Sequence, residues 1–434
     1  MQVKVLTEHY DKDEYIGIKG YQKHGGYEVI KKALKMKPEE IVQLVKESGL
    51  RGRGGAGFPT GMKWSFLPKN NEPRYLLCNA DEGEPGTYKD RLMMERAPHQ
   101  LIEGMVIAAH AVQSNKSYIY VRGEYVYPIK VVEKAIQEAY DAGFLGKNIL
   151  GTGFNHDMDI YRGAGAYICG EETGMISSLE GLKGQPKLKP PFPAVKGYLR
   201  KPTVVNNVET LACVTYIVKD GPQVFRKYGT EKSPGTKLFS ISGDVQKPGN
   251  YEVALGMPLM DMIQMAGGLK AGRKLKAVIP GGSSAPVITA EEAQRAKMDF
   301  DSLAAMGTML GSGADIIIDD SHCMVDLLSV IMSFYHHESC GQCTPCREGT
   351  GWLDKVVRNI VGGTGRPQDV DLIETVAKNM MGRTICALSD AAAMPAISFV
   401  TKFRDEFDYF VREKKSKVKG DYKIRGLEHA QVHH

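Results

Sequence analysis

Tyr75–Gly86, with the sequence YLLCNADEGEPG, is the stretch that decides the fold class of this chain. Its apolar first residues predict a short buried strand, and the polar run after them predicts a loop at the end of that strand. The pattern then predicts a helix at 101–112, a strand at 117–121, a helix at 128–140 and a strand at 157–161. Strand–helix–strand order through this region is typical of an α/β layer with a largely parallel sheet. We therefore expect ligands at the loops beyond the strand ends.

The pattern changes from about residue 234 onward. Short strand patterns surround one short helix, which predicts a small α+β module; the strands lie at 237–242, 250–254, 276–279 and 314–318, and the helix at 258–266. The chain after Met324 is mostly helical and predicts a C-terminal bundle with helices at 324–335, 350–360, 368–381 and 390–411. We thus expect three domains, 1–233, 234–322 and 323–420, followed by a tail at 421–434 that looks partly tag-derived.

The composition excludes several functional classes. The net charge of +5 is carried by residues 411–425, which hold seven Lys/Arg and two Asp/Glu. The rest of the chain is neutral, so we expect no nucleic-acid-binding face and interpret the basic tail as a solvated segment. No stretch approaches the roughly 20 apolar residues of a membrane span. The N-terminus lacks the apolar core of a signal peptide, so we expect a cytosolic protein or one peripheral to a membrane from the cytosolic side.

Cysteines crowd into one short segment, Cys340-Gly-Gln-Cys343-Thr-Pro-Cys346. Three thiolates at this C-x2-C-x2-C spacing suit one face of a [4Fe–4S] cluster, which normally takes four thiolates. Cys386, between two predicted helices, is the best candidate for the fourth ligand. Zinc, completed by His336 or His337, remains an alternative, although zinc sites usually pair two ligands with two. Buried reduced cysteines without a metal are the remaining alternative.

Glycine is enriched, with 48 of 434 residues, about 11% against a usual roughly 7%. One concentration is the loop 51–61, RGRGGAGFPTG, which contains a G-x-G-x-x-G match. A dinucleotide-binding fingerprint needs a strand before it and a helix after it, and here a helix precedes, so the match alone is weak. The density of glycines indicates instead that backbone approaches a flat ring or a phosphate closely, with Arg53 and Lys63 supplying positive charge.

Two further polar segments follow at predicted helix starts. In the loop 163–174, Glu171 and Glu172 precede a helical run, so that helix capping by one of them competes with ligand binding. In Asn206-Asn207-Val-Glu209-Thr210, amides and a hydroxyl at a helix N-terminus suit a phosphate, and ordinary capping is again the alternative.

Several motifs together resemble one known family. They are GRGGAGFPTGMKW at 52–64, NADEGEPGTYKDR at 79–91, GAGAYICGEET at 163–173, KPPFPA at 189–194, VNNVET at 205–210 and SCGQCTPCREG at 339–349. In this order they resemble the flavoprotein subunits (the F subunits) of NADH-quinone oxidoreductase, respiratory complex I. The likeness extends over about residues 10–415. It implies a Rossmann-like FMN-binding domain, a ubiquitin-like (β-grasp) module and a helical bundle carrying an iron–sulfur cluster.

The resemblance also implies site residues, position by position. The FMN contacts would be Gly54, Lys63, Asn79, Asp81, Glu82, Gly170, Glu171, Asn206, Asn207 and Thr210. The NADH contacts would be Phe66, Glu84, Tyr167, Glu172, Lys189 and Phe192. The [4Fe–4S] ligands would be Cys340, Cys343, Cys346 and Cys386. No side chain is implied as a general acid or base, and Glu84 would assist positioning.

The implied activity is NADH dehydrogenation, with a hydride passed to FMN and electrons passed singly to the cluster and on to quinone. We expect Phe66 and Phe192 to hold the adenine, and acids near the ribose to favour NADH over NADPH. The implied partners are the thioredoxin-like [2Fe–2S] protein (the E subunit) and the large iron–sulfur protein (the G subunit), in the peripheral arm at the cytoplasmic face of the inner membrane. The alternatives are a diaphorase subunit of an NAD-linked hydrogenase or formate dehydrogenase, which often carries fused modules absent here, and a non-enzymatic metal-stabilised scaffold.

Overall fold

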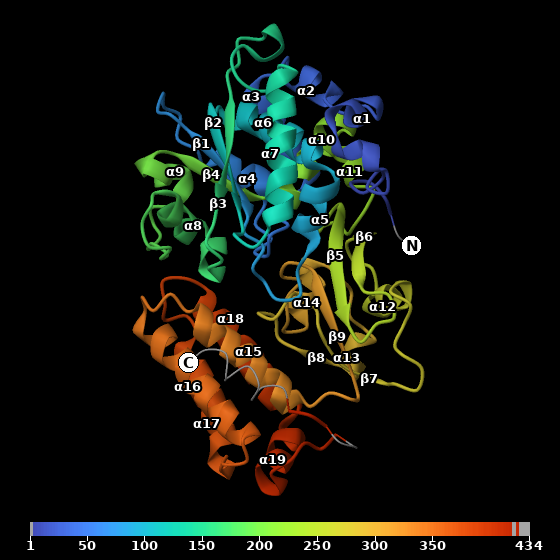
Figure 1. Cartoon of the computed structure of the whole chain (residues 1–434), viewed down its shortest axis with the longest axis vertical. Helices are drawn as coiled ribbons and strands as arrows, with labels where there is room; N and C mark the ends of the chain where they lie inside the picture. Colours follow the sequence, from blue (N-terminus) through green and yellow to red (C-terminus); the bar gives the residue numbers. More distant parts are fainter. Residues whose placement is uncertain (1–2, 419–421, 425–434) are drawn as a thin grey trace.

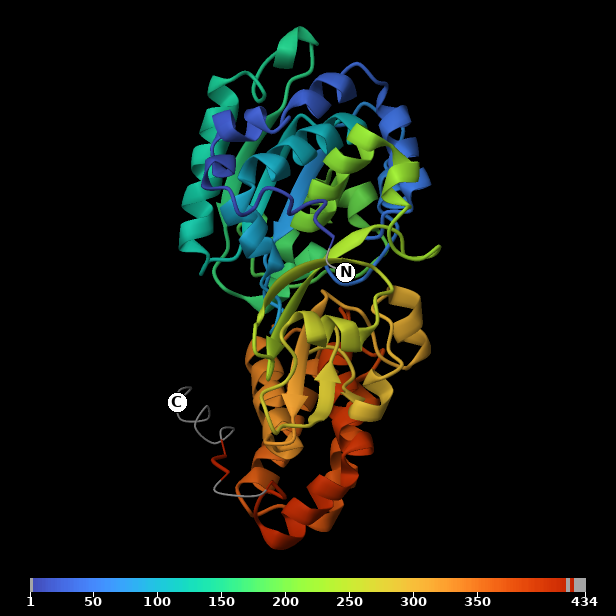
Figure 2. The same ribbon diagram turned by 90° about the vertical axis from the view of Figure 1, so that its right-hand side faces the viewer.

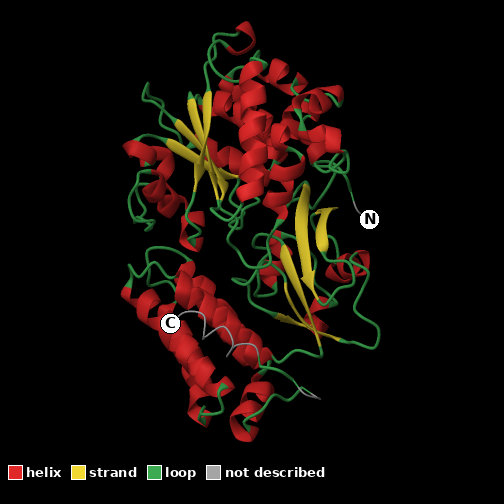
Figure 3. Ribbon diagram, viewed as in Figure 1, coloured by secondary structure: helices red, strands yellow, loops and turns green. Residues whose placement is uncertain are grey.

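The computed structural model of the chain describes residues 3–418 and 422–424. The N-terminal α/β region occupies one half of the long axis, and the second sheet and the C-terminal helices lie side by side in the other half (Figure 1). The N-terminal α/β region lies at one end, the C-terminal helices lie at the other, and a second sheet lies beside the junction (Figures 2 and 3).

The first sheet is parallel throughout, as the sequence predicts. Its strands are β1 (Tyr75–Ala80), β2 (Lys116–Val121), β3 (Asp157–Arg162) and β4 (Thr203–Asn207), in the order β3-β2-β1-β4. The strand β4 was not expected, because its apolar residues are few and run directly into a helix. Because all four strands run the same way, their carboxyl ends meet at one edge, which is the expected ligand edge.

Helices cover both faces of this sheet. The longer ones are α3 (Pro38–Ser48), α5 (Lys89–Arg96), α6 (Pro98–Val112), α7 (Val126–Asp141), α8 (Glu172–Leu179) and α10 (Val208–Asp220). The shorter ones are η1 (Asp13–Ile16), α1 (Ile18–Lys23), α2 (Glu28–Ala33), α4 (Thr60–Ser65), η2 (Ile149–Gly151), η3 (Tyr167–Gly170), α9 (Pro193–Lys196), η4 (Tyr198–Arg200) and α11 (Pro222–Phe225). Helix α6 is buried on almost every side, which explains its apolar sequence.

The second sheet is mixed. It is built from β5 (Thr236–Gly243), β6 (Gly249–Ala254), β7 (Leu275–Ile279), β8 (Ile288–Thr289) and β9 (Ala314–Asp319), in the order β6-β5-β9-β7-β8. The strands that come first and last along the chain, β5 and β9, are parallel neighbours in the middle of the sheet. The other pairs of neighbouring strands are antiparallel. Helices α12 (Leu259–Met265), α13 (Ala290–Ala293) and α14 (Phe300–Ala305) accompany it. This is the expected β-grasp arrangement.

The C-terminal region is helical, with two differences from the expected pattern. Its helices are α15 (Met324–Glu338), α16 (Thr344–Val361), α17 (Pro367–Met380), α18 (Leu388–Lys402) and α19 (Arg404–Glu413). The single helix expected at 390–411 is interrupted at Phe403, which leaves helical geometry between α18 and α19. Helix α16 begins at Thr344 rather than at 350, because Pro345 is well tolerated in a first turn.

The hydrophobic core joins the regions. One cluster of buried residues contains Leu77 of β1 and Ile168 of η3 together with Leu328 of α15 and Leu388 of α18. The bundle therefore packs against the ligand edge of the first sheet through shared apolar contacts, which fixes its position relative to that edge.

Two expectations concern the ends and the membrane. Among the described helices, none is both long enough and apolar enough to cross a bilayer. Most of the tail expected at 421–434 lies outside the described residues. Tyr422 is described, and its hydroxyl donates to Asp326 Oδ2 at 2.8 Å, so this part of the tail contacts the bundle and is not simply solvated.

Candidate functional site

A cavity of about 360 Å³ lies at the carboxyl ends of the parallel strands. All three regions line it. From the expected site residues it takes Gly54, Asn79, Asp81, Glu82, Glu84, Tyr167, Gly170, Glu171, Asn207 and Cys386. From residues that were not expected it takes, among others, Thr87, Lys89, Asp90, Ser284, Met309, Ser312, Leu388 and Met394. Residues expected to contact FMN and a residue expected to bind iron therefore share one cavity.

The glycine loop forms one wall of the cavity. A Cβ atom on Gly54 would lie 3.0 Å from Cβ of Asn207, so a larger residue would push the loop away from the start of α10 by a few tenths of an ångström. The Arg53 amide donates to Thr210 Oγ1 at 2.8 Å and holds the loop there. The Arg53 guanidinium, by contrast, is buried and donates to the carbonyls of Pro234 and Thr236, so it does not supply charge to the cavity as expected.

The end of β1 supplies polar side chains. The Asn79 amide donates to the Gly170 carbonyl at 2.8 Å and ties the two loops together. Burial raises the pKa of Asp81 to about 7 and that of Glu82 to about 7. The Glu82 carboxylate accepts from the Asp90 and Arg91 amides at 2.8 and 3.0 Å, so that it caps the start of α5.

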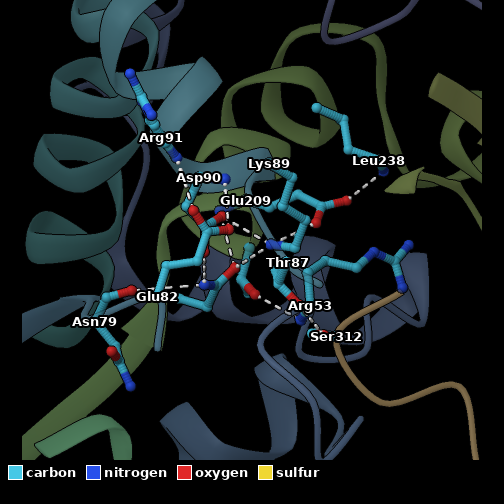
Figure 4. Close-up of polar contacts among 12 residues, drawn as sticks. Arg53, Asn79, Glu82, Thr87, Lys89, Asp90, Arg91, Glu209, Leu238 and Ser312 are labelled. Atoms are coloured by element: carbon cyan, nitrogen blue, oxygen red, sulfur yellow. Dashed lines mark hydrogen bonds and ion pairs between the residues drawn. The ribbon is translucent and has the colours of Figure 1, made fainter. Parts of the chain in front are cut away.

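A buried ionic network, which includes Lys89, Asp90 and Glu209, reaches the wall of the cavity through Lys89 and Asp90 (Figure 4). The Lys89 ammonium contacts Asp90 Oδ1 at 2.7 Å and Glu209 Oε2 at 2.9 Å. The Lys237 ammonium of β5 contacts the same Glu209 oxygen at 3.1 Å. Glu209 also accepts from the Leu238 amide at 2.8 Å. Burial raises the pKa of Glu209, but the surrounding cations outweigh it and lower that pKa to about 2.

This network was not predicted, although its members were visible in the sequence. Lys89 and Asp90 lie inside the motif at 79–91, and Glu209 lies inside the motif at 205–210. Lys237 is the one charged residue of the strand β5, and a fully buried lysine is rare unless it is paired. A lysine in such a strand could have indicated a carboxylate partner elsewhere in the chain.

The two acids of the second loop have separate roles. Glu171 is the N-cap of α8, and its Oε2 accepts from the Thr173 and Gly174 amides at 2.8 and 2.9 Å. Lys189 Nζ donates to Glu171 Oε1 at 2.8 Å and to Glu172 Oε1 at 3.4 Å. Lys63 donates to Glu172 Oε2 at 2.8 Å. The two lysines thus balance the two carboxylates at this end of the site.

Glu84 is fixed by the second sheet and by η3. Its carboxylate accepts from the Tyr167 hydroxyl at 2.7 Å and from the Ser284 amide at 2.8 Å. Burial raises its pKa, and these hydrogen bonds partly offset the rise. A Cβ atom on Gly282, whose φ is +91°, would lie 2.5 Å from Glu84 Cγ, so this position requires glycine. Glu84 is thereby held rigidly at the cavity.

The aromatic residues near the glycine loop divide into two groups. Trp64 is buried and donates from Nε1 to Asn206 Oδ1 at 2.8 Å. Phe66 and Phe192 are 52% and 57% exposed and do not line the cavity. Because both rings are exposed, they are available to stack on a planar group.

The four cysteines lie at the junction between the bundle and the cavity. Cys346 is in the first turn of α16, Cys343 precedes that helix, and Cys386 precedes α18. Around a single tetrahedral zinc ion the sulfurs would be about 3.8 Å apart. Among the described residues, Asp244, Asp319 and His322 are the group of potential ligands within 4.8 Å of one another, and the cysteines are not such a group. Wider spacing fits a cluster in which each thiolate binds a different iron.

Comparisons with known proteins show the family to which the chain belongs. Three family models match in order: the Nuo51 FMN-binding domain at residues 45–216, the SLBB domain at 237–318, and the NADH-ubiquinone oxidoreductase-F iron-sulfur binding region at 326–409.

Individual relatives match along nearly the whole chain. An NADH-quinone oxidoreductase F subunit of Rhizobium meliloti is 56% identical over 91% of this chain and 94% of its own length. The F subunit of Streptomyces coelicolor is 49% identical over 93% of this chain and 90% of its own length. The crystal structure of an NAD+-reducing [NiFe]-hydrogenase in the H2-reduced state superposes with a TM-score of 0.81 at 36% identity, over 92% of this chain and 67% of that chain. The chain therefore belongs to the family of NADH-quinone oxidoreductase F subunits.

Proposed function

We propose that the chain oxidises NADH within an NADH-quinone oxidoreductase, using FMN and a [4Fe–4S] cluster. The observation that carries the proposal is the single cavity that extends from the glycine loop to Cys386. A flavin held against Gly54 and Asn207 and a cluster held by Cys386 would then be close neighbours. When bound, FMN would supply the chemistry that links two-electron donors to one-electron acceptors.

The residues around the glycine loop fit a flavin mononucleotide. Gly54 and Gly170 leave backbone open to a planar ring, and Asn79, Asp81 and Glu82 offer polar atoms at its edge. The start of α10, with Asn206, Asn207 and Thr210, suits the phosphate because helix N-termini bind anions. We propose Lys63 and Glu171 as further contacts, since both belong to the ion pairs at the rim of the site.

The residues on the other side of the cavity fit the coenzyme. Glu84 and Tyr167, which hydrogen-bond to each other, would fix the nicotinamide end, and Glu172 with Lys189 would position the ribose and the pyrophosphate. Phe66 and Phe192 would stack on the adenine. None of these groups moves a proton in the reaction; they orient the coenzyme, which is the main contribution a protein makes to hydride transfer.

The cluster would be held by Cys340, Cys343, Cys346 and Cys386. Two hydrogen bonds to the sulfurs support this assignment: Ser339 Oγ lies 3.3 Å from Cys346 Sγ, and the Ile385 amide donates to Cys343 Sγ at 3.4 Å. Hydrogen bonds of this kind raise the reduction potential of iron–sulfur clusters because they stabilise negative charge on sulfur. They would favour acceptance of electrons from the flavin side.

The wider context follows from the family. We propose partners of the iron–sulfur type, namely the thioredoxin-like [2Fe–2S] protein (the E subunit) and the large iron–sulfur protein (the G subunit), in the peripheral arm at the cytoplasmic face of the inner membrane. We also propose that residues 1–233, 234–322 and 323–420 are the domains. The three matching family models, each inside one of these ranges, support the division.

A diaphorase subunit of an NAD-linked hydrogenase is the second candidate, because a hydrogenase structure has the same fold at 36% identity. The F-subunit relatives are more similar, at 48–56% identity, and therefore favour the first candidate.

The test is an absorbance spectrum of the purified protein before and after anaerobic addition of NADH. We expect a flavin band with a broad iron–sulfur shoulder that bleaches on addition of NADH. A coloured protein that NADH does not bleach would contradict the enzymatic function, and a colourless protein with bound zinc would support a metal-stabilised scaffold.

A further inference from the structure

Asp244, Asp319 and His322 form a cluster of potential metal ligands far from the cysteines in sequence. Their ligand atoms all lie within 4.8 Å of one another. Asp244 directly follows β5, Asp319 ends β9, and His322 lies in the turn that leads to α15. The cluster therefore stands where the β-grasp sheet joins the helical bundle.

The backbone places these three side chains in a fixed arrangement. The strands β5 and β9 are parallel neighbours, and the Asp244 amide continues their pairing by donating to the Ile317 carbonyl at 2.9 Å. The Asp319 amide donates to Asp244 Oδ2 at 2.9 Å. The Asp319 carboxylate in turn accepts from the Ser321 amide at 2.8 Å, which shapes the turn that presents His322. Such second contacts orient metal ligands in proteins.

Among the described residues, the cations Arg273 and Lys270 act on the two carboxylates of the cluster. His322 Nε2 lies 3.1 and 3.2 Å from the two oxygens of Asp244, and the side chain of Asp319 is only 2% exposed, with its second oxygen 3.8 Å from Arg273 Nε. Arg273 is about half exposed and can turn outward. Lys276 is engaged elsewhere, with Glu406 and the His322 carbonyl. Asp244 pairs with the imidazole, and a divalent ion would balance the charge of both carboxylates.

We propose that Asp244, Asp319 and His322 bind one Zn²⁺ ion, independently of the cofactor site. One imidazole and two carboxylates with a water molecule complete a four-coordinate site, whereas Ca²⁺ and Mg²⁺ prefer more ligands, all of them oxygen. Zinc at about 2.1 Å from each ligand requires separations of about 3.4 Å. The His322–Asp244 separation is close to this value, and the Asp319 side chain would turn to bring its carboxylate to the same distance from both of the other ligands. The ion would take the place of the Nε2 proton of His322 and clamp the β-grasp sheet to the bundle.

In the test, Zn²⁺ alone is titrated into the full-length protein with FMN and the cluster bound, and calorimetry measures the binding. Iron content before and after titration confirms that Cys340, Cys343, Cys346 and Cys386 are not free to bind zinc. We expect one zinc ion whose affinity falls at least about 100-fold in His322→Gln and in Asp319→Asn, since even outer partners of metal ligands are worth about 10- to 100-fold. Asp408→Asn, which removes an exposed acid from an ion pair with Arg404, should leave the affinity unchanged.

Hydrogen exchange of the wild-type protein locates the ion without any substitution. We expect zinc to slow amide exchange in peptides covering 243–247 and 319–324 and not in peptides of α19. Equal zinc affinity in wild type, His322→Gln and Asp319→Asn would overturn the proposal, and so would unchanged exchange in both peptides at saturating zinc. This second measurement decides the matter even if the variants fold poorly.

Discussion

Glu209 holds two cations from different regions of the chain, and its neutralisation should therefore destabilise the whole site. The substitution Glu209→Gln keeps the size of the side chain but removes the charge that faces Lys89 at 2.9 Å and Lys237 at 3.1 Å. Glu209 and Lys237 are both fully buried, so water cannot take over the lost interaction. We expect a large loss of stability for so small a chemical change.

The size of the loss follows from the titration of Glu209. Its pKa is lowered from 4.5 to about 2. A shift of one pKa unit corresponds to about 1.4 kcal/mol, so the charged form of Glu209 contributes about 3 kcal/mol to the free energy of folding. Loss of one partner from a buried ion pair typically costs a similar amount, about 3 to 5 kcal/mol. For a chain of 434 residues with an unfolding entropy of about 0.9 kcal/mol/K, a loss of this size is a decrease of about 3 to 6 °C in Tm.

The measurement is thermal unfolding followed by circular dichroism at fixed scan rate with excess FMN, because loss of FMN would lower Tm by itself. Glu28→Gln is the matched control, since Glu28 is an exposed acid whose pair with Lys31 is worth about 0 to 1 kcal/mol. If Glu209→Gln and Glu28→Gln shift Tm equally, the network carries no stability and the argument is wrong.

The stability that Glu209 contributes should depend on pH. Because the pKa of Glu209 is lower in the folded state, its contribution is fully present above about pH 4.5 and is lost as the pH falls toward 2. The Tm difference between wild type and Glu209→Gln should therefore narrow in that window. Lys237 behaves in the opposite sense: burial outweighs the attraction of Glu209 and lowers its pKa to about 8. The free-energy cost of burying the charged ammonium disappears as the pH rises from about 8 to 10.5, because Lys237 loses its proton in the folded state first. In this range wild type should gain stability relative to Lys237→Met.

Three other substitutions test separate parts of the site. Glu84→Gln should raise KM for NADH or slow turnover while FMN content stays unchanged, since Glu84 positions the coenzyme; a protein purified without FMN would contradict this. Cys386→Ser should lower iron content and the absorbance of the cluster without loss of flavin, and full iron occupancy would remove Cys386 from the ligand set. Gly54→Ala should weaken FMN binding by about tenfold or more, because its Cβ would lie 3.0 Å from Asn207 Cβ; equal FMN affinity by fluorescence titration would show that the loop can move away.

Local patterns were sufficient to predict most of the architecture. The alternation of apolar strands and helices predicted β1, β2 and β3 with α6 and α7 between them, although not α5, and the change of pattern near residue 234 predicted the second sheet. Errors arose where an element depends on its neighbours. The strand β4 exists because β1 supplies a hydrogen-bonding edge, which no pattern within residues 203–207 reveals. The end of α18 at Phe403 was likewise hidden, because the residues on both sides favour helix.

Site residues that lie inside the sequence motifs could be predicted. Site residues that reach the cavity only because two regions of the chain pack together could not. Gly54, Asn79 and Gly170 were expected and line the cavity. The walls supplied by Ser284 and Met309 come from glycine- and serine-rich segments, GGSS at 281–284 and GTMLGSG at 307–313, which are not among the recognised motifs. Met394 comes from the helix α18, which has no such signature. Their role follows only from packing of the β-grasp sheet and the bundle against the ligand edge, which requires contacts distant in sequence.

The buried ion pairs explain how such a composite site keeps its shape. Hydrophobic contacts hold the three regions together, but they allow small displacements of one region relative to another because apolar packing has little directionality. Glu209 adds directional contacts: it binds Lys89, beside the cavity, and Lys237 and the Leu238 amide of β5. Sliding of β5 by even one residue would leave charges buried and unpaired at a cost of several kcal/mol. A substitution at Lys237, outside the cavity lining, should therefore alter FMN affinity through the position of Lys89 and the glycine loop.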